Sequence, residues 1–154
     1  TIMGVPVGRE MGESPEEDER GSIIGIVATD APLLPHQLKR LARRVSLGIG
    51  RSGAISGHGS GDIFMAFSTA NEDAHHDEKR LAMAEFVPNS RLDRVFEAVI
   101  QAVDEAIMNS IFANETMVGF NKSRVEALPH QAVMEILRRF NALSSLSDSR
   151  VSNI

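Results

Sequence analysis

Gly21 and Ser22 form a junction at which a serine opens an apolar strand directly after a polar, acidic stretch. A serine in this position can cut its own chain. Its hydroxyl would attack the carbonyl carbon of Gly21, the acyl group would move from nitrogen to oxygen, and hydrolysis would leave Ser22 as a new N-terminus. The freed α-amine, with an ordinary pKa of about 7.7 to 8.0, would then serve as the base. The same residues also fit a simpler interpretation, in which Ser22 merely begins a strand after a loop.

A second group of small and polar residues lies between residues 48 and 61, which hold six of the twelve glycines. Such a loop is flexible or tightly wound, and its backbone amides can approach a ligand. Ser60 and Asp62 stand where the next predicted strand begins. Residues 48–53 match a dinucleotide fingerprint as a string, but that motif follows a strand and opens a helix, whereas this one ends a helix. Residues 57–61 lack the spacing of a nucleophile elbow.

The histidines support weaker hypotheses. His75 and His76 head a short acidic run, but neighbouring side chains point in different directions on a helix or a strand, so we predict no metal site. A Ser/His/Asp hydrolase can be written with Ser60, with His58 or His36, and with an aspartate. Nothing in the sequence fixes those groups together, and this hypothesis ranks last.

Composition limits the class of protein. The 154 residues are 42% hydrophobic and 24% charged, as expected for one soluble globular domain. Residues 1–21 carry four of the five net negative charges, so the remainder is nearly neutral and lacks the basic surface that nucleic acids require. With no cysteine and no run long enough to span a bilayer, we expect a cytoplasmic protein that binds neither nucleic acid nor membrane.

Apolar periodicity predicts an α/β arrangement of central strands covered by helices. The two strands are apolar on both faces, which favours cover on both sides, and two strands are too few for a stable sheet. We therefore expect other polypeptide to supply more strands. The predicted elements are an acidic linker over 1–21, strands over 23–28 and 62–69, a polar connection over 70–90, helices from Pro35, from Ser90 to Ile111 and from about Pro129, and a frayed tail over 144–154.

Several longer strings resemble one family, the L-aminopeptidase/D-esterase family of N-terminal-nucleophile hydrolases, which includes the β-aminopeptidases. The resemblance covers essentially residues 21–142. The strings that carry it are Gly21-Ser22-Ile23-Ile24, residues 28–38 from Ala28 to Leu38, Gly59-Ser60-Gly61-Asp62-Ile63-Phe64, residues 66–71 from Ala66 to Asn71, Glu105-Ala106-Ile107, Glu115-Thr116-Met117 and Ala127-Leu128-Pro129-His130.

The resemblance implies a precursor that cleaves itself between Gly21 and Ser22. Residues 1–21 would be the tail of an α subunit, and residues 22–154 the whole β subunit. It also implies an αββα sandwich, with two sheets covered by helices and shared with an α-subunit segment that this chain lacks. Several αβ heterodimers would assemble into a homo-oligomer.

Carried over by position, the resemblance makes Ser22 the nucleophile and Ser60 a second active-site serine. Asp62 stands where the family often has glutamate, and it would hold or tune the Ser22 amine. Amides near Gly59 and Gly61 would bind an oxyanion. The implied activity is an aminopeptidase, amidase or esterase on short peptides and on amino-acid amides and esters, D- or β-configured residues among them, with no cofactor or metal. The alternatives are a non-catalytic binding module built on the glycine loop and an acyltransferase of related fold.

Overall fold

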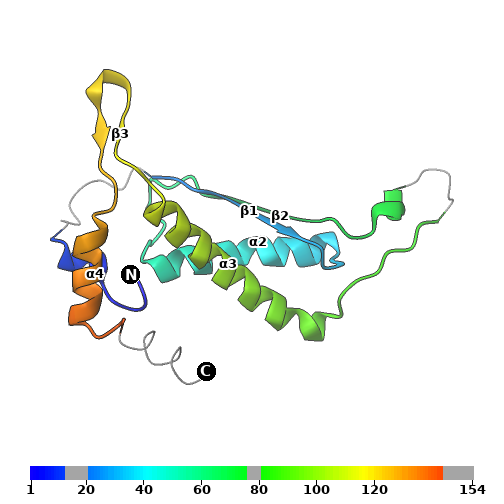
Figure 1. Ribbon diagram of the computed structural model, residues 1–154. Helices are drawn as coiled ribbons and strands as arrows, with labels where there is room; N and C mark the ends of the chain where they lie inside the picture. The colour runs from blue at the N-terminus through cyan, green and yellow to red at the C-terminus, as the bar shows by residue number, and fades with distance from the viewer. Residues whose placement is uncertain (13–20, 76–80, 144–154) are drawn as a thin grey trace, which may run out of the picture. The chain divides into compact units, whose positions relative to one another are not determined.

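The computed structural model describes residues 1–12, 21–75 and 81–143. The chain forms two compact units, Thr1–Asp18 with Ala106–Ile154, and Glu19–Glu105. The acidic run predicted to be a linker and the predicted C-terminal tail lie outside the described residues. In chain order the elements are α1 (Val7–Glu10), β1 (Ile24–Thr29), α2 (Pro35–Ser52), β2 (Ile63–Ser68), η1 (Glu72–His75), η2 (Asn89–Arg91), α3 (Leu92–Phe112), β3 (Met117–Val118), η3 (Phe120–Lys122), β4 (Arg124–Val125) and α4 (His130–Arg139) (Figure 1).

Strands β1 and β2 form a parallel pair joined through helix α2. The register begins with Ile24 opposite Ile63 and ends with Thr29 opposite Ser68. Parallel strands need a crossover connection, and α2 provides it. Both strands were predicted from their apolar runs, and both are confirmed to within two residues at each end.

One face of this two-stranded sheet packs tightly on α2. A Cβ atom on Gly25 would lie 2.6 Å from Val45 Cγ1 and 3.1 Å from Phe64 Cδ1, so only glycine fits between the strand and the helix. Val45 and Leu41 on the same helix are almost completely buried. The break that Gly25 makes in the apolar run of β1 is therefore a packing requirement.

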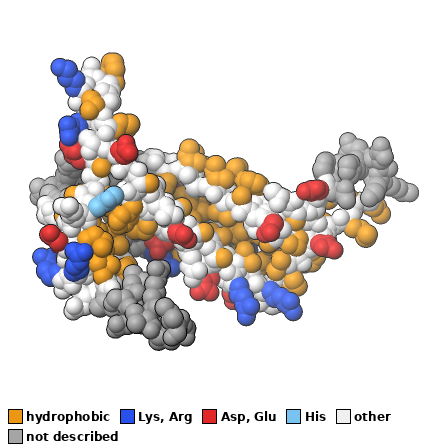
Figure 2. Space-filling view, in the orientation of Figure 1, with side chains coloured by type: hydrophobic (Ala, Val, Ile, Leu, Met, Phe, Trp, Pro, Cys, Tyr) orange, Lys and Arg blue, Asp and Glu red, His pale blue; other side chains and the backbone are white. Residues whose placement is uncertain are grey.

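The other face of the sheet is apolar and exposed. Ile24 retains 71% of its accessible surface, and its neighbours on both strands are also open. Figure 2 shows hydrophobic side chains gathered along these strands. Among the described residues, α2 packs on one face of the sheet only, so the cover predicted for the second face would have to come from other polypeptide. The exposed apolar face consists of Ile24, Ile26, Ala28, Ile63, Met65 and Phe67.

Helix α2 runs further than the sequence indicated. The glycine-rich loop was predicted to start at Gly48, but the helix continues to Ser52 and ends at Gly53, which adopts a left-handed φ of 113°. Gly48 allows close contact with α3, since a Cβ there would lie 2.6 Å from Val103 Cβ. Tertiary packing at this glycine outweighs its low helix propensity.

Buried Gln37 fixes the start of α2. Its side chain accepts a hydrogen bond from the Leu34 backbone amide at 2.9 Å and donates to the Val87 carbonyl at 2.8 Å. Because every polar atom of a buried amide needs a partner, this residue ties the end of the 81–91 segment to the helix. The helix predicted from Ser90 is confirmed, although its first turn is the short helix η2 and α3 proper begins at Leu92.

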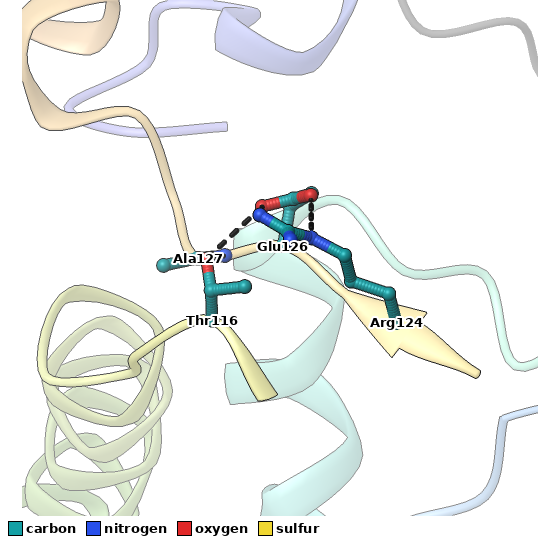
Figure 3. Close-up of polar contacts among 4 residues, drawn as sticks. All are labelled: Thr116, Arg124, Glu126 and Ala127. Atoms are coloured by element: carbon teal, nitrogen blue, oxygen red, sulfur yellow. Dashed lines mark hydrogen bonds and ion pairs between the residues drawn. The ribbon is translucent and has the colours of Figure 1, made fainter. Parts of the chain in front are cut away.

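The other unit contains α1, the β3–β4 hairpin and α4. The strands pair Met117 with Val125 and Val118 with Arg124, and the helix predicted near Pro129 is confirmed as α4. Glu126 closes the base of the hairpin by accepting hydrogen bonds from Thr116 and Arg124 (Figure 3). Thr116 in turn accepts a hydrogen bond from the Ala127 amide at 3.1 Å. No helix among the described residues is long and apolar enough to cross a membrane.

Candidate active site

The register of β1 and β2 places the proposed nucleophile. Because Ile24 pairs with Ile63, the residues just before the strands, Ser22 and Gly61, also lie side by side. The Gly61 backbone amide donates a hydrogen bond to Ser22 Oγ at 3.0 Å. This bond holds the hydroxyl oxygen in place while leaving its proton free for transfer to a base.

Asp62 uses its two carboxylate oxygens for two different tasks. Oδ1 accepts a hydrogen bond from the backbone amide of Ile23 at 3.0 Å, and Oδ2 accepts one from the Ser56 hydroxyl at 3.0 Å. The carboxylate therefore binds the peptide group immediately after Ser22. The sequence had suggested instead that Asp62 acts on the Ser22 amine, and in the continuous chain that nitrogen is still part of the Gly21–Ser22 peptide.

Hydrogen bonding stabilises the ionised form of Asp62. Donation from the Ser60 side chain has the largest effect in lowering the pKa of Asp62 below its ordinary value, followed by the Ile23 amide. Desolvation opposes them, and the Ser56 hydroxyl adds a smaller effect in the lowering direction. Asp62 is therefore a carboxylate throughout the neutral range, fixed by hydroxyl and amide donors.

Ser60 reaches this cluster through a tight turn. Its backbone amide donates to the Gly57 carbonyl at 2.9 Å, which reverses the chain just before Asp62. The structure therefore brings together three of the predicted site residues, Ser22, Ser60 and Asp62. The Gly61 amide binds Ser22, the proposed nucleophile, and the oxyanion role expected for the amides of Gly59 and Gly61 stays a prediction.

Sequence reasoning missed Ser56. This residue lies in the loop after α2 with a left-handed φ of 49°, which is uncommon for residues other than glycine. Its hydroxyl contacts the Asp62 carboxylate six residues further along. A serine among glycines gave no signal in the sequence, because the contact depends on how the loop returns to β2.

The histidine hypotheses gain no support from the described residues. Asp62 accepts hydrogen bonds from the Ser56 hydroxyl and the Ile23 amide, and the Ser60 side chain helps to lower its pKa, whereas His36 lies in the first turn of α2 and His58 in the loop. Among the described residues, no group of three or more His, Asp and Glu side chains could hold a metal ion. His76 and the two acidic residues after it lie outside them.

This arrangement has the elements of nucleophilic acyl chemistry. The Ser22 hydroxyl is held by a backbone amide, the peptide after it is held by the Asp62 carboxylate, and the Ser56 hydroxyl donates to that carboxylate. All of these groups sit at the N-terminal ends of two paired strands, so the sheet fixes their spacing. Rigid elements position reacting groups more accurately than loops do.

Solved structures share this fold. The L-aminopeptidase D-ala-esterase/amidase of Ochrobactrum anthropi, described as a prototype for the serine aminopeptidases, superposes with a TM-score of 0.80 at 45% identity over 92% of this chain and 39% of its own. A β-aminopeptidase of Burkholderia sp. gives a TM-score of 0.73 at 36% identity over 88% of this chain and 39% of its own. The class is therefore an α/β protein with the Ntn hydrolase fold, as the Ochrobactrum enzyme is described.

Sequence comparison identifies the family. Residues 1–125 match Peptidase family S58, and the chain belongs to that family. The β-peptidyl aminopeptidase BapA of Sphingosinicella microcystinivorans is 40% identical over 160 residues, which cover 94% of this chain and 40% of the relative. The chain thus spans about two fifths of the length of the relatives that it matches.

Proposed function

We propose that this chain is the part of an S58-family precursor that contains the self-cleavage site and the nucleophile of a serine aminopeptidase. Ser22 is the nucleophile, and the scissile bond joins it to Gly21. The observation that carries the proposal is the hydrogen bond from the Gly61 amide to Ser22 Oγ, with Asp62 bound to the next peptide. The aminopeptidase and amidase relatives support the same chemistry.

Self-cleavage consumes one water molecule. Ser22 Oγ adds to the carbonyl carbon of Gly21, the bond from that carbon to the Ser22 nitrogen breaks, and the nitrogen takes a proton to become an amine. Water then hydrolyses the Gly21 ester, which releases a carboxylate on Gly21 and restores the hydroxyl of Ser22. Asp62 assists by holding the Ile23 amide, so that the backbone after the scissile bond cannot rotate away from the attack geometry.

Turnover uses the same hydroxyl with a new base. The free amine of Ser22 accepts the hydroxyl proton as Oγ attacks a substrate carbonyl, and it returns that proton to the leaving amine or alcohol. Water releases the acyl group in the second half of the reaction. Asp62, which already binds the neighbouring Ile23 amide, would stabilise the new ammonium and keep it near the site.

The exposed apolar face of the β1–β2 sheet indicates where the rest of the precursor packs. Monomeric proteins rarely expose a contiguous patch of several large apolar side chains, as this sheet does. A two-stranded sheet is also not stable by itself. We propose that strands from the missing α-subunit segment cover this face and complete the sandwich. That segment would also line the substrate pocket, and the αβ heterodimers would form a homo-oligomer.

The proposed substrates are short peptides and amino-acid amides or esters with a free N-terminal amine. The relatives are described as acting on β-peptides and as D-alanine esterase/amidases. The acceptor of the acyl group in the proposal is water.

The nucleophile is tested with Ser22→Ala in the full-length precursor. We expect neither self-cleavage nor hydrolysis of aminoacyl amides, because the attacking oxygen is gone. Ser46→Ala is the matched control, since Ser46 is an exposed serine of α2 whose hydroxyl donates to the Arg43 carbonyl. Cleavage before residue 22, or amidase activity, in the Ser22→Ala protein would contradict the proposal.

A further inference from the structure

The segment before the proposed cleavage site contains a short folded element. Ile2 and Val5 form a two-way backbone bridge, with Ile2 N to Val5 O at 3.0 Å and Val5 N to Ile2 O at 2.9 Å. Met3 and Gly4 have φ values of 51° and 79°, so the bridge is closed by a tight turn of two left-handed residues. The turn leads directly into α1.

Helix α1 is a single turn that ends in a defined way. The Met11 amide bonds to the Val7 carbonyl at 2.9 Å, and the Gly12 amide bonds to the Arg9 carbonyl at 3.1 Å. Gly12 has a left-handed φ of 78°, as is typical of a residue that stops a helix. Residues 2–12 are thus a compact piece with hydrogen bonds of its own.

This piece is packed on α4. Val5 and Val7 retain only 6% and 3% of their accessible surface, and they share one apolar cluster with Val133, Ile136 and Leu137. Figure 1 shows the N-terminal segment, in blue, against α4. The contact is mutual, because Val133 and Leu137 are buried where the N-terminal valines meet them.

An ion pair lies at the edge of this contact. Arg139, near the end of α4, binds the carboxylate of Glu10 in α1. The contact therefore combines an apolar centre with a charged rim, as stable interfaces between separate chains do. A solvated linker would need neither feature.

We propose that residues 2–12 are an anchor segment that keeps the end of the upstream chain docked on α4 after the chain is cut between Gly21 and Ser22. The proposal rests on the proposed self-cleavage. Before cleavage the anchor segment and α4 belong to one polypeptide. Afterwards they belong to two, and this apolar contact holds the new C-terminal end of the α subunit on the β subunit without a covalent bond.

The test is hydrogen exchange, followed by mass spectrometry, on peptides from residues 2–12 and 130–139 of the full-length protein. It is measured in the Ser22→Ala protein, which cannot cut itself, before and after the chain is severed at a specific protease site inserted between residues 12 and 21. This cut does not depend on Ser22, so a failure of self-cleavage would sink the proposed function and leave the docking measurable. We expect the same slow exchange in both peptides before and after the cut.

Two variants with the same added charge separate docking from a general effect. Val7→Asp should raise the exchange rate of the 2–12 peptide at least about tenfold, because it places a carboxylate in the apolar cluster. Gly8→Asp should leave it unchanged, since Gly8 is exposed and a Cβ there has no neighbour within 4 Å. Val7→Ala, a milder change, should fall between them.

Fast exchange of the 2–12 peptide once the chain is severed would overturn the proposal. So would equal protection in the Val7→Asp and Gly8→Asp proteins.

Discussion

The chain holds a carboxylate in place in two regions, and the two sites are built differently. Asp62 is bound by hydroxyl groups and a backbone amide beside Ser22, the proposed nucleophile, whereas Glu126 is bound chiefly by Arg124 at the base of a hairpin. Hydrogen bonding lowers the pKa of both groups. A perturbed carboxylate by itself therefore does not identify a site of reaction.

The difference lies in what each carboxylate positions. Glu126 and its partners join the two arms of one hairpin, and the arginine neutralises the charge. None of the hydrogen bonds that perturb Asp62 comes from a cation, and one of them holds the peptide that follows Ser22. A charge held by neutral donors remains able to stabilise a positive group such as the Ser22 ammonium.

After Ser22→Ala, the largest loss of self-cleavage is expected for Asp62→Asn. The amide keeps an oxygen for the Ile23 amide, but it has no charge and its nitrogen cannot accept a bond from Ser56 or Ser60. We expect self-cleavage to slow by at least about 100-fold, the scale seen when one preorganised electrostatic group is removed from an active site. The rate of self-cleavage is measured as a time course of precursor conversion after cell-free synthesis. A wild-type rate in Asp62→Asn would mean that Asp62 contributes no more to cleavage than Glu126 does.

A packing variant tests the close contact between Gly48 and Val103. In Gly48→Ala the new methyl group would lie 2.6 Å from Val103 Cβ, and such overpacking costs about 1 to 3 kcal/mol. The gain in helix propensity is only about 1 kcal/mol, so we expect a net loss in the free energy of unfolding. Gly50→Ala is the matched control, because a Cβ at Gly50 meets nothing within 4 Å and only the gain remains. Denaturation midpoints decide between them, and equal midpoints would refute the close contact.

Ser56 is expected to have a smaller effect on self-cleavage. Replacing it with alanine removes one donor to Asp62, and a bond to a charged but exposed acceptor is worth about tenfold in rate. Ser56→Gly accepts the left-handed φ without strain, so the two variants separate the hydroxyl from the backbone. If the hydroxyl matters, both should be slow. A slow alanine variant beside a normal glycine variant would assign the effect to the backbone.

The Ser56 variants should also change how the rate of self-cleavage depends on pH. The pKa of Asp62 is lower in the folded chain than in the unfolded one, so its stabilising effect is present above the ordinary pKa of about 4 and is lost as the pH falls through the folded value. Removing the Ser56 hydroxyl raises that folded pKa. The acid limb of the rate profile should therefore move to higher pH in Ser56→Gly, and an unmoved limb would count against the bond.

The smallest effect is expected for Glu126→Gln. It weakens the exposed ion pair with Arg124 and should leave the rate of self-cleavage within about twofold of wild type, since exposed pairs contribute little. Cleavage is followed in the same time course as for Asp62→Asn. A loss comparable to that of Asp62→Asn would mean that the hairpin takes part in the reaction.

Local patterns predicted the elements better than their ends. The strands were found from apolar runs and α4 from its proline, but α2 was ended too early because Gly48 looks like a loop residue. The close contact of Gly48 with Val103, more than fifty residues away, explains why the helix continues through this glycine. Local sequence patterns cannot predict such a contact. Residues 1–12 were read as the start of a linker, since their partner α4 lies more than a hundred residues further on.

The site was predicted in part. The junction at Ser22 suggested a nucleophile from chemistry alone, and the roles of Ser60 and Asp62 came from the family resemblance. What the sequence could not supply was the register of β1 and β2, which sets Gly61 beside Ser22 and Asp62 beside Ile23. Ser56 depends on the same long-range geometry and on a backbone conformation that serine rarely adopts.

The central claim is that the chain cuts itself before Ser22, and intact mass with N-terminal sequencing of the product of the complete gene tests it most directly. The account predicts two chains, one ending in Gly21 and one beginning with Ser22. A single uncut chain in correctly folded protein would contradict it, because Ser22 would then lack the free amine on which turnover depends.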